Sequence, residues 1–245
     1  MFRILAFSIF IVSALFGGNF DLKTYKSQLL KVEDIYAYIK DDEAIKIGSS
    51  GVVSHQFKSS TSIIARAVVI EKKDGLAKLE FRVFDMLEQN ALPVPGIIPE
   101  KGDEVTLNFL YNRALIIAPD KQSYDYISAQ FPELYFVHPD IFGAYLIQNF
   151  ELGPKRSSFR GFCSKNAVGI IIFALDEKAQ IVDCQDFNVL QEVSIPKASE
   201  LQTPFYSRIS GYKTHIFDFE AQEVKDYYKY YDVLINLPKV LKDEK

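Results

Sequence analysis

A β-hairpin in the first half constrains the fold of this 245-residue sequence more than any other feature. Ser62 to Lys72 (SIIARAVVIEK) and Leu76 to Phe84 (LAKLEFRVF) read as two strands rich in apolar and β-branched residues. Asp74 and Gly75 lie at the tip between them, and Asp-Gly is a strong signal for a tight hairpin turn. The hairpin predicts an antiparallel sheet at the centre of the first half.

Further short strands are expected on both sides of this hairpin. Two are predicted within Lys23 to Lys40 and one over Val52 to Phe57. Glu104 to Leu110 and Arg113 to Ala118 are expected to pair with each other, after a loop at residues 91–103 whose prolines cannot donate ladder hydrogen bonds. Together these strands predict a small barrel-like unit.

The second half is expected to mix helices with strands. Asp120 is predicted to cap a helix that ends at Pro132, and Asp140 is predicted to cap a second helix after a short strand at residues 134–137. A last helix is expected near Glu220 to Leu234. Other strands of this half are predicted over 157–163, 168–175, 180–187, 205–209 and 215–219.

Cys163 and Cys184 fall in the first and third strands of the meander predicted over residues 157–187. That register places their Cα atoms more than about 10 Å apart, beyond the roughly 7 Å that a disulfide allows. We therefore expect two free, partly buried thiols. A bridge stays open as the alternative, since an even number of cysteines in an oxidising compartment favours one and a different register would bring the pair together.

These elements predict an α+β fold dominated by antiparallel β-structure. The first subdomain is a β-rich, barrel-like unit over residues 19–118, and the second is a mixed α+β unit over residues 119–236. A signal peptide over residues 1–18 is expected to precede them, and a polar C-terminal tail over residues 237–245 to follow them.

The predicted signal peptide combines a basic start with a short apolar run. Arg3 is followed by the run from Ile4 to Phe16 and by small residues suited to cleavage. The run is shorter than the roughly 20 residues that span a bilayer, although an uncleaved anchor is the alternative. We expect an exported protein in the periplasm or at the outer membrane or cell surface, without an integral membrane segment after cleavage.

Charge and motifs argue against several classes of protein. A formal net charge of −4, with no basic stripe, makes nucleic acid a poor partner. The common hydrolase, metalloprotease and nucleotide-binding motifs are missing from the sequence, so no enzyme activity, no cofactor and no metal are predicted. His55, His138 and His215 are scattered singly, and residues 48–51 read as a β-turn rather than an anion cradle. An envelope enzyme would require a pocket that joins Cys163 or His138 to a carboxylate.

Four tyrosines gather in the last predicted helix. Tyr228 and Tyr231 share its apolar stripe with Val224, whereas Tyr227 and Tyr230 fall off that stripe. We therefore expect half of the cluster to face outward, toward another domain or a partner protein, although core packing explains most of the cluster.

Three blocks of sequence together resemble the N-terminal domain family of the bacterial plasminogen-binding proteins PgbA and PgbB. The first is IIARAVVIEKKDGLAKLEFRVFDMLEQNALPVPGIIPEKGDEV, and YNRALIIAPDKQSY and YFVHPDIFGAYL follow in the same order and with similar spacing. The likeness runs from about Leu22 to about Phe219. It implies an exported, non-enzymatic protein that binds host plasminogen through a C-terminal lysine.

The sequence ends in Lys245, which the resemblance makes the predicted contact, with Lys242 and Lys239 as helpers. A terminal lysine carries an ammonium and a carboxylate on one residue, and kringle lysine-binding sites recognise that pair by charge-assisted hydrogen bonds and cation–π contact. The resemblance also implies a long charged extension after this domain, whereas seven residues, KVLKDEK, are seen here after Pro238. The alternative function is a periplasmic scaffold that binds envelope proteins, such as a structural part of the flagellar motor.

Overall fold

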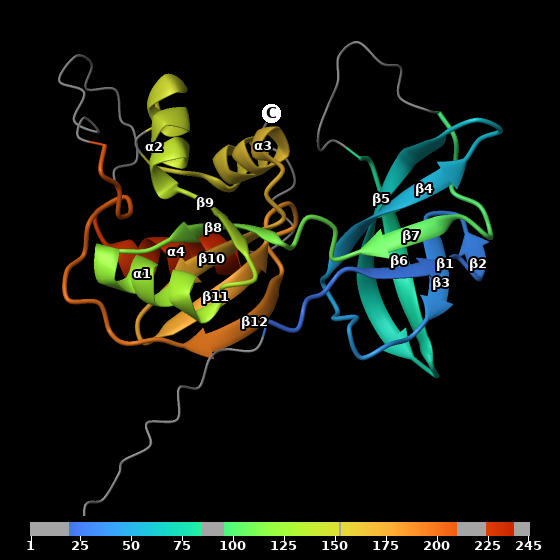
Figure 1. The fold of residues 1–245 in the computed structure, drawn as a ribbon, viewed down its shortest axis with the longest axis horizontal. Coiled ribbons are helices and arrows are strands. Elements are labelled where there is room, and N and C mark those ends of the chain that lie inside the picture. Colours follow the sequence, from blue (N-terminus) through green and yellow to red (C-terminus); the bar gives the residue numbers. More distant parts are fainter. Residues whose placement is uncertain (1–19, 85–95, 152, 210–223, 238–245) are drawn as a thin grey trace, which may run out of the picture.

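Two β-sheets, one in each half of the chain, lie side by side (Figure 1). The computed structural model describes residues 20–84, 96–151, 153–209 and 224–237. The predicted signal peptide, the strand expected at 215–219 and the polar tail after Leu237 lie outside these residues. The predicted α+β class is confirmed, because all described strand pairs are antiparallel except the two made by one strand of the second sheet.

The first sheet curls into a barrel-like unit, as predicted. Its strands are β1 (Tyr25–Gln28), β2 (Lys31–Glu33), β3 (Tyr36–Lys40), β4 (Ser50–Gln56), β5 (Thr61–Lys73), β6 (Leu76–Arg82) and β7 (Glu104–Leu107), in the order β1-β7-β4-β5-β6-β3-β2. β1 and β2 are consecutive in the chain but lie at opposite edges of the sheet. The residues between them bond to the strands next to both edges, since Leu29 N donates to Asp103 O, just before β7, and Leu30 N donates to Tyr38 O of β3. One bent segment therefore joins the two edges.

The predicted hairpin is β5 and β6. Asp74 and Gly75 have φ values of 52° and 76°, the left-handed conformation that a two-residue hairpin turn requires at both positions. The barrel interior is filled by the inward-facing residues of these strands and their neighbours, including Ala37, Ile39, Val53, Val69, Leu79 and Val105.

The second sheet is mixed and lies between two layers of helices. Its strands are β8 (Arg113–Ile117), β9 (Tyr135–Val137), β10 (Ile170–Ala174), β11 (Lys178–Asp183) and β12 (Val189–Ser194), in the order β12-β11-β10-β8-β9. The described helices are α1 (Lys121–Gln130), α2 (Pro139–Gln148), α3 (Arg156–Asn166) and α4 (Tyr227–Asn236). One apolar cluster joins one face to α1, and the other joins the opposite face to α2, α3 and α4. None of the described helices has both the length and the apolar character of a membrane span.

The predicted partner of β8 is wrong. Arg113 to Ala118 does not pair with Glu104 to Leu110, because β8 pairs in parallel with β9 and β10 of the second sheet. The four residues after Arg113 are buried. A strand buried on both faces suits the centre of a mixed sheet covered by helices better than a barrel wall with one wet face.

The strand predicted over residues 157–163 is the helix α3. Its buried residues Ser158, Phe159, Phe162 and Cys163 recur at the three- and four-residue spacing of a helix face. The error also reverses the thiol prediction, because Cys163 and Cys184 form a disulfide with a Cα–Cα distance of 6.5 Å. A helix that packs over the sheet brings Cys163 above Cys184, which two strands of separation in one sheet cannot do.

The helix caps were predicted correctly at α1 and wrongly at α2. Asp120 accepts from Ser123 N over 2.8 Å, as expected for an N-cap. At α2 the cap is His138, whose Nδ1 accepts from Asp140 N over 3.1 Å. Asp140 lies in the first helical turn instead, and its carboxylate accepts from Ser207 and Arg208.

The tyrosines of α4 are more buried than predicted. The helix begins at Tyr227 rather than near Glu220, and Tyr227 and Tyr231 are both fully buried. The outward position expected for Tyr227 is wrong, because its hydroxyl donates to Ile117 O of β8 over 2.9 Å. Residues 205–209, predicted as a strand, form no regular element, and β12 was not predicted.

Candidate functional site

Lys239, Lys242 and Lys245 lie outside the described residues, so their surroundings stay a prediction. The structure does describe the helix from which the tail departs. Arg156 of α3 donates to the carbonyls of Leu234, Ile235 and Leu237 over 2.7, 2.6 and 3.2 Å. The last carbonyls of a helix have no intrahelical partner, so this guanidinium acts as a side-chain cap for the end of α4.

Replacing Arg156 with Met should loosen the last turn of α4. The variant removes three hydrogen bonds to carbonyls, and we expect a loss of about 1–3 kcal/mol in local stability together with faster amide exchange at residues 234–237. Arg160→Met is the matched control, since Arg160 lies on the same helix but donates to Gln185 O. Equal exchange in α4 for both variants would show that Arg156 does not cap the helix.

The predicted histidines occupy different parts of the molecule. His138 caps α2, and burial lowers its pKa despite the nearby Asp140 carboxylate. His215 lies outside the described residues. Cys163 is in a disulfide and its sulfur is buried, so neither Cys163 nor the capping nitrogen of His138 is placed as a nucleophile or general base.

His55 meets two carboxylates at one end of the barrel. Its Nδ1 lies 2.8 Å from Asp103 Oδ1 and 3.9 Å from Glu100 Oε1, a grouping of ligand atoms that could hold a metal ion. The second oxygen of Asp103 accepts from Glu100 N over 2.9 Å. Both Asp103 oxygens therefore have a hydrogen-bonding partner within the protein.

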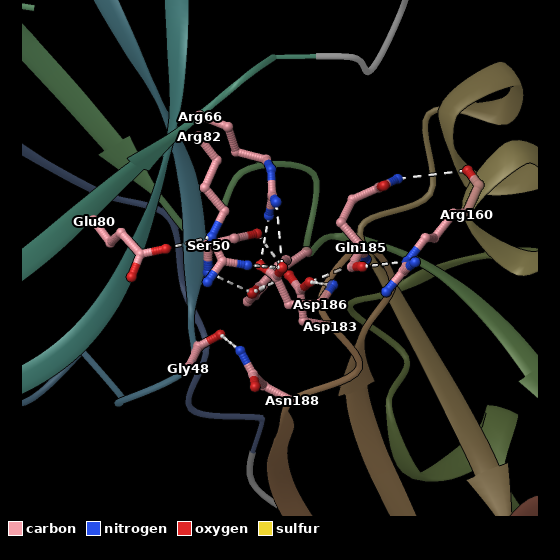
Figure 2. A network of polar contacts seen from close by, with 11 residues as sticks. Gly48, Ser50, Arg66, Glu80, Arg82, Arg160, Asp183, Gln185, Asp186 and Asn188 are labelled. Atoms are coloured by element: carbon pink, nitrogen blue, oxygen red, sulfur yellow. Dashed lines mark hydrogen bonds and ion pairs between the residues drawn. The ribbon is translucent and has the colours of Figure 1, made fainter. Parts of the chain in front are cut away.

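A denser polar network lies where the two sheets meet (Figure 2). It centres on residues 183–188, which begin at the last residue of β11 and which we call the docking turn. Asp183 shapes this turn, because its Oδ1 accepts from the backbone N–H groups of Gln185 and Asp186 over 3.0 and 2.7 Å. Such an Asx turn fixes a tight bend with the side chain of its first residue.

The other oxygen of Asp183 reaches the barrel. Asp183 Oδ2 accepts from Ser50 Oγ of β4 over 2.6 Å and from Tyr111 Oη over 2.7 Å. Tyr111 Oη in turn accepts from Ser50 N over 2.8 Å. Burial raises the pKa of the Asp183 carboxyl and the neighbouring Asp186 carboxylate raises it further, whereas the donors from Ser50 and Tyr111 oppose that rise.

Asp186 forms ion pairs with two arginines of the barrel. Arg66 of β5 binds it through two nitrogens, over 2.5 and 3.2 Å, and Arg82 of β6 binds its Oδ1. The side chains of Arg66 and Asp186 are only 9% and 6% exposed, so this pair is removed from water. A buried ion pair depends on both partners, because either charge alone would be costly to bury.

Gly48 lets the docking turn approach the barrel backbone. Asn188 Nδ2 donates to Gly48 O over 3.0 Å, and a Cβ at residue 48 would lie 2.9 Å from the Asn188 Cβ. Gly48 also has a φ of 92°, which favours glycine. The turn predicted at residues 48–51 lies a few residues earlier, because Ser49 N donates to Lys46 O and Ser50 already begins β4. This turn and the start of β4 are part of the contact between the two sheets. That contact was not predicted.

Residues 24–235 match a family model described as "Plasminogen-binding protein pgbA N-terminal". The chain is 28% identical over 199 residues to "Plasminogen-binding protein PgbA" of Helicobacter pylori strain J99, a stretch covering 80% of this chain and 44% of the relative. PgbA of strain 26695 matches at the same identity, over 80% of this chain and 43% of that relative. The chain thus spans less than half the length of these curated relatives. The family resemblance predicted from the sequence is confirmed.

Proposed function

Because this chain belongs to the family of PgbA N-terminal domains, we propose that it binds plasminogen and that Lys245 is its main contact. Both curated relatives bear the name of plasminogen-binding proteins. That shared name is the observation that carries the proposal. The chemistry of a terminal lysine, with its ammonium and carboxylate, identifies the kringle lysine-binding sites of plasminogen as the partner surface.

The anchoring of α4 supports this role for the tail. Tyr227, Tyr231 and the Arg156 cap fix the helix against the second sheet, so the tail departs from a rigid point after Leu237. Eight residues follow Leu237, and an extended chain of that length reaches at most about 28 Å. One terminal residue supplies only part of a protein–protein affinity, so we expect a Kd of about 1 μM or weaker for a single copy.

Replacing Lys245 with Ala tests the proposal. We expect plasminogen capture by the chain ending at residue 245 to fall at least tenfold, because the ammonium of the zwitterion is lost. Digestion with a basic-residue carboxypeptidase should have the same effect, and excess free lysine should compete. The readout is surface plasmon resonance on immobilised plasminogen.

Lys242→Ala and Lys239→Ala are the matched controls, since each removes one ammonium from the same tail but leaves the terminal residue intact. Each should lower capture less than Lys245→Ala does. Unchanged capture after removal of Lys245 would contradict the terminal-lysine contact. A loss of capture equal in all three variants would instead indicate general charge attraction.

The proposal also requires export and exposure at the cell surface. Protease treatment of intact cells should remove the protein if it is surface-exposed. Protection until the outer membrane is opened would instead favour a periplasmic scaffold that contacts envelope proteins, and plasminogen binding would then be confined to the purified protein.

A further inference from the structure

The docking turn is held from behind by a covalent bond. Cys184 lies inside the turn, directly after Asp183, and its partner Cys163 lies on α3. Arg160 of α3 supports the same turn through a hydrogen bond from its Nε to Gln185 O over 2.7 Å (Figure 2). Helix α3 therefore fixes the back of the turn at two neighbouring residues, Cys184 and Gln185.

The front of the same turn makes the contacts with the barrel. Asp183 accepts from Ser50, Asp186 binds Arg66 and Arg82, and Asn188 donates to Gly48 O, as the close-up shows. Three of the six residues in the turn thus reach the barrel, while the residue after Asp183 is bonded to α3. The position of these carboxylates depends on the shape of one short turn.

We propose that the Cys163–Cys184 disulfide is a redox-sensitive lock on the docking of the two sheets. With the bond formed, the turn is ordered before docking, so its two carboxylates meet the barrel without a further loss of chain entropy. A dithiol reductant breaks the S–S bond and leaves a thiol on each cysteine, while the reductant becomes a cyclic disulfide. Two electrons and two protons pass to the protein, and docking must then order the turn itself.

Docking should in turn protect the disulfide. Both cysteines are fully buried, and Cys184 packs with Phe159 and Phe187 in the apolar cluster beneath α3. If the bond favours docking by some factor, docking favours the bond by the same factor, because the two equilibria are linked. This reciprocity distinguishes a lock from a disulfide that only stabilises the second unit internally.

The first experiment compares amide exchange of the full chain before and after reduction by dithiothreitol, with the Cys163→Ala/Cys184→Ala double variant alongside. We expect exchange at Ser50, Gln185 and Asp186 to quicken at least tenfold on reduction, since their N–H groups bond within the network. Val69, whose N–H bonds to Ser49 O inside the barrel, should be unchanged. X-ray scattering should show a larger radius of gyration.

Two outcomes of this experiment would overturn the proposal. Unchanged exchange at the network amides would show that docking does not depend on the disulfide. Loss of protection throughout β10 as well would show that the bond stabilises the whole second unit rather than the docking turn. Only a loss of amide protection that is confined to the docking turn and its contacts with the barrel agrees with the proposal.

The second experiment leaves both cysteines in place. Asp186→Asn weakens docking. The linkage predicts that the disulfide of this variant is reduced more easily in glutathione buffers: its equilibrium constant for reduction should rise by the factor by which the docking equilibrium falls, at least about fivefold. Glu104→Gln is the matched control, because Glu104 forms an exposed ion pair with Lys26 on the barrel. An Asp186→Asn disulfide as resistant as that of the unchanged protein would refute the coupling.

Discussion

Replacing Asp186 with Ala is expected to lower the free energy of unfolding by about 3–5 kcal/mol. The substitution removes the carboxylate shared by Arg66 and Arg82, whose side chains are 9% and 33% exposed. Arg82 can turn toward water or rely on Glu80, to which it is also bonded. The side chain of Arg66 is far less exposed than that of Arg82, so its charge would stay largely buried. Urea unfolding followed by circular dichroism measures the loss.

The double variant Arg66→Met/Asp186→Leu is the control for this mechanism. Because it removes the buried charge together with its partner, we expect it to be more stable than Asp186→Ala, although it contains one more substitution. If Asp186→Ala lowers the free energy of unfolding by less than about 1 kcal/mol, the guanidinium of Arg66 must reach water in the variant. The pair would then resemble an exposed ion pair. A double variant less stable than the single would indicate that the shape of the pair matters more than its charge.

The elements that were predicted correctly carry their signals within a few residues. The turn at Asp74 and Gly75 sets the β5–β6 register as far as Glu71, where a bulge shifts it, and Asp120 caps α1 through its own side chain. Neither depends on the rest of the fold. The residues that form this turn and this cap are adjacent in the sequence, which is why the hairpin and the start of α1 could be predicted.

The partners of buried strands could not be predicted in the same way. β10 is apolar along its length, and β8 is apolar after Arg113. This pattern indicates burial on both faces but does not indicate which strand lies beside them. Sequence proximity favoured pairing Arg113 to Ala118 with the preceding strand, and the fold instead used them to begin the second sheet. The parallel pairs depend on contacts between residues far apart in the chain.

The disulfide was predicted wrongly because the element that contains Cys163 was predicted as a strand and is a helix. Treating residues 157–163 as a strand gave a separation of more than about 10 Å between the cysteines, whereas helix α3 gives 6.5 Å. Phe159, Phe162 and Cys163 carried the helical spacing that would have corrected it.

The sequence also contains one signal of the network between the sheets. Arg66 interrupts an apolar strand, and a charged residue in such a position requires a buried partner. Nothing local identifies that partner as Asp186.

Tyr111→Phe is expected to lower the free energy of unfolding by about 3 kcal/mol at neutral pH. The variant keeps the buried ring but removes the hydroxyl that donates to Asp183 and accepts from Ser50 N. A hydrogen bond to a buried charge contributes about 1.5–3 kcal/mol, and the orphaned N–H adds its own desolvation cost. Tyr227→Phe is the matched control, because it loses a hydrogen bond from an equally buried ring to the neutral carbonyl of Ile117, and it should cost about 1 kcal/mol.

The effect of Tyr111→Phe should also grow with pH. The folded protein raises the pKa of Asp183, so it binds a proton more tightly than the unfolded chain does. The stability contributed by Asp183 is therefore fully present below its unfolded pKa of about 4 and is lost as the pH rises through the folded pKa. Tyr111 opposes this rise in pKa, so Tyr111→Phe should raise the pKa further and deepen the loss. Urea unfolding at acidic and neutral pH should show a larger difference from the unchanged protein at neutral pH, and an equal difference at both would mean that Asp183 is not a buried carboxylate when the two sheets are docked.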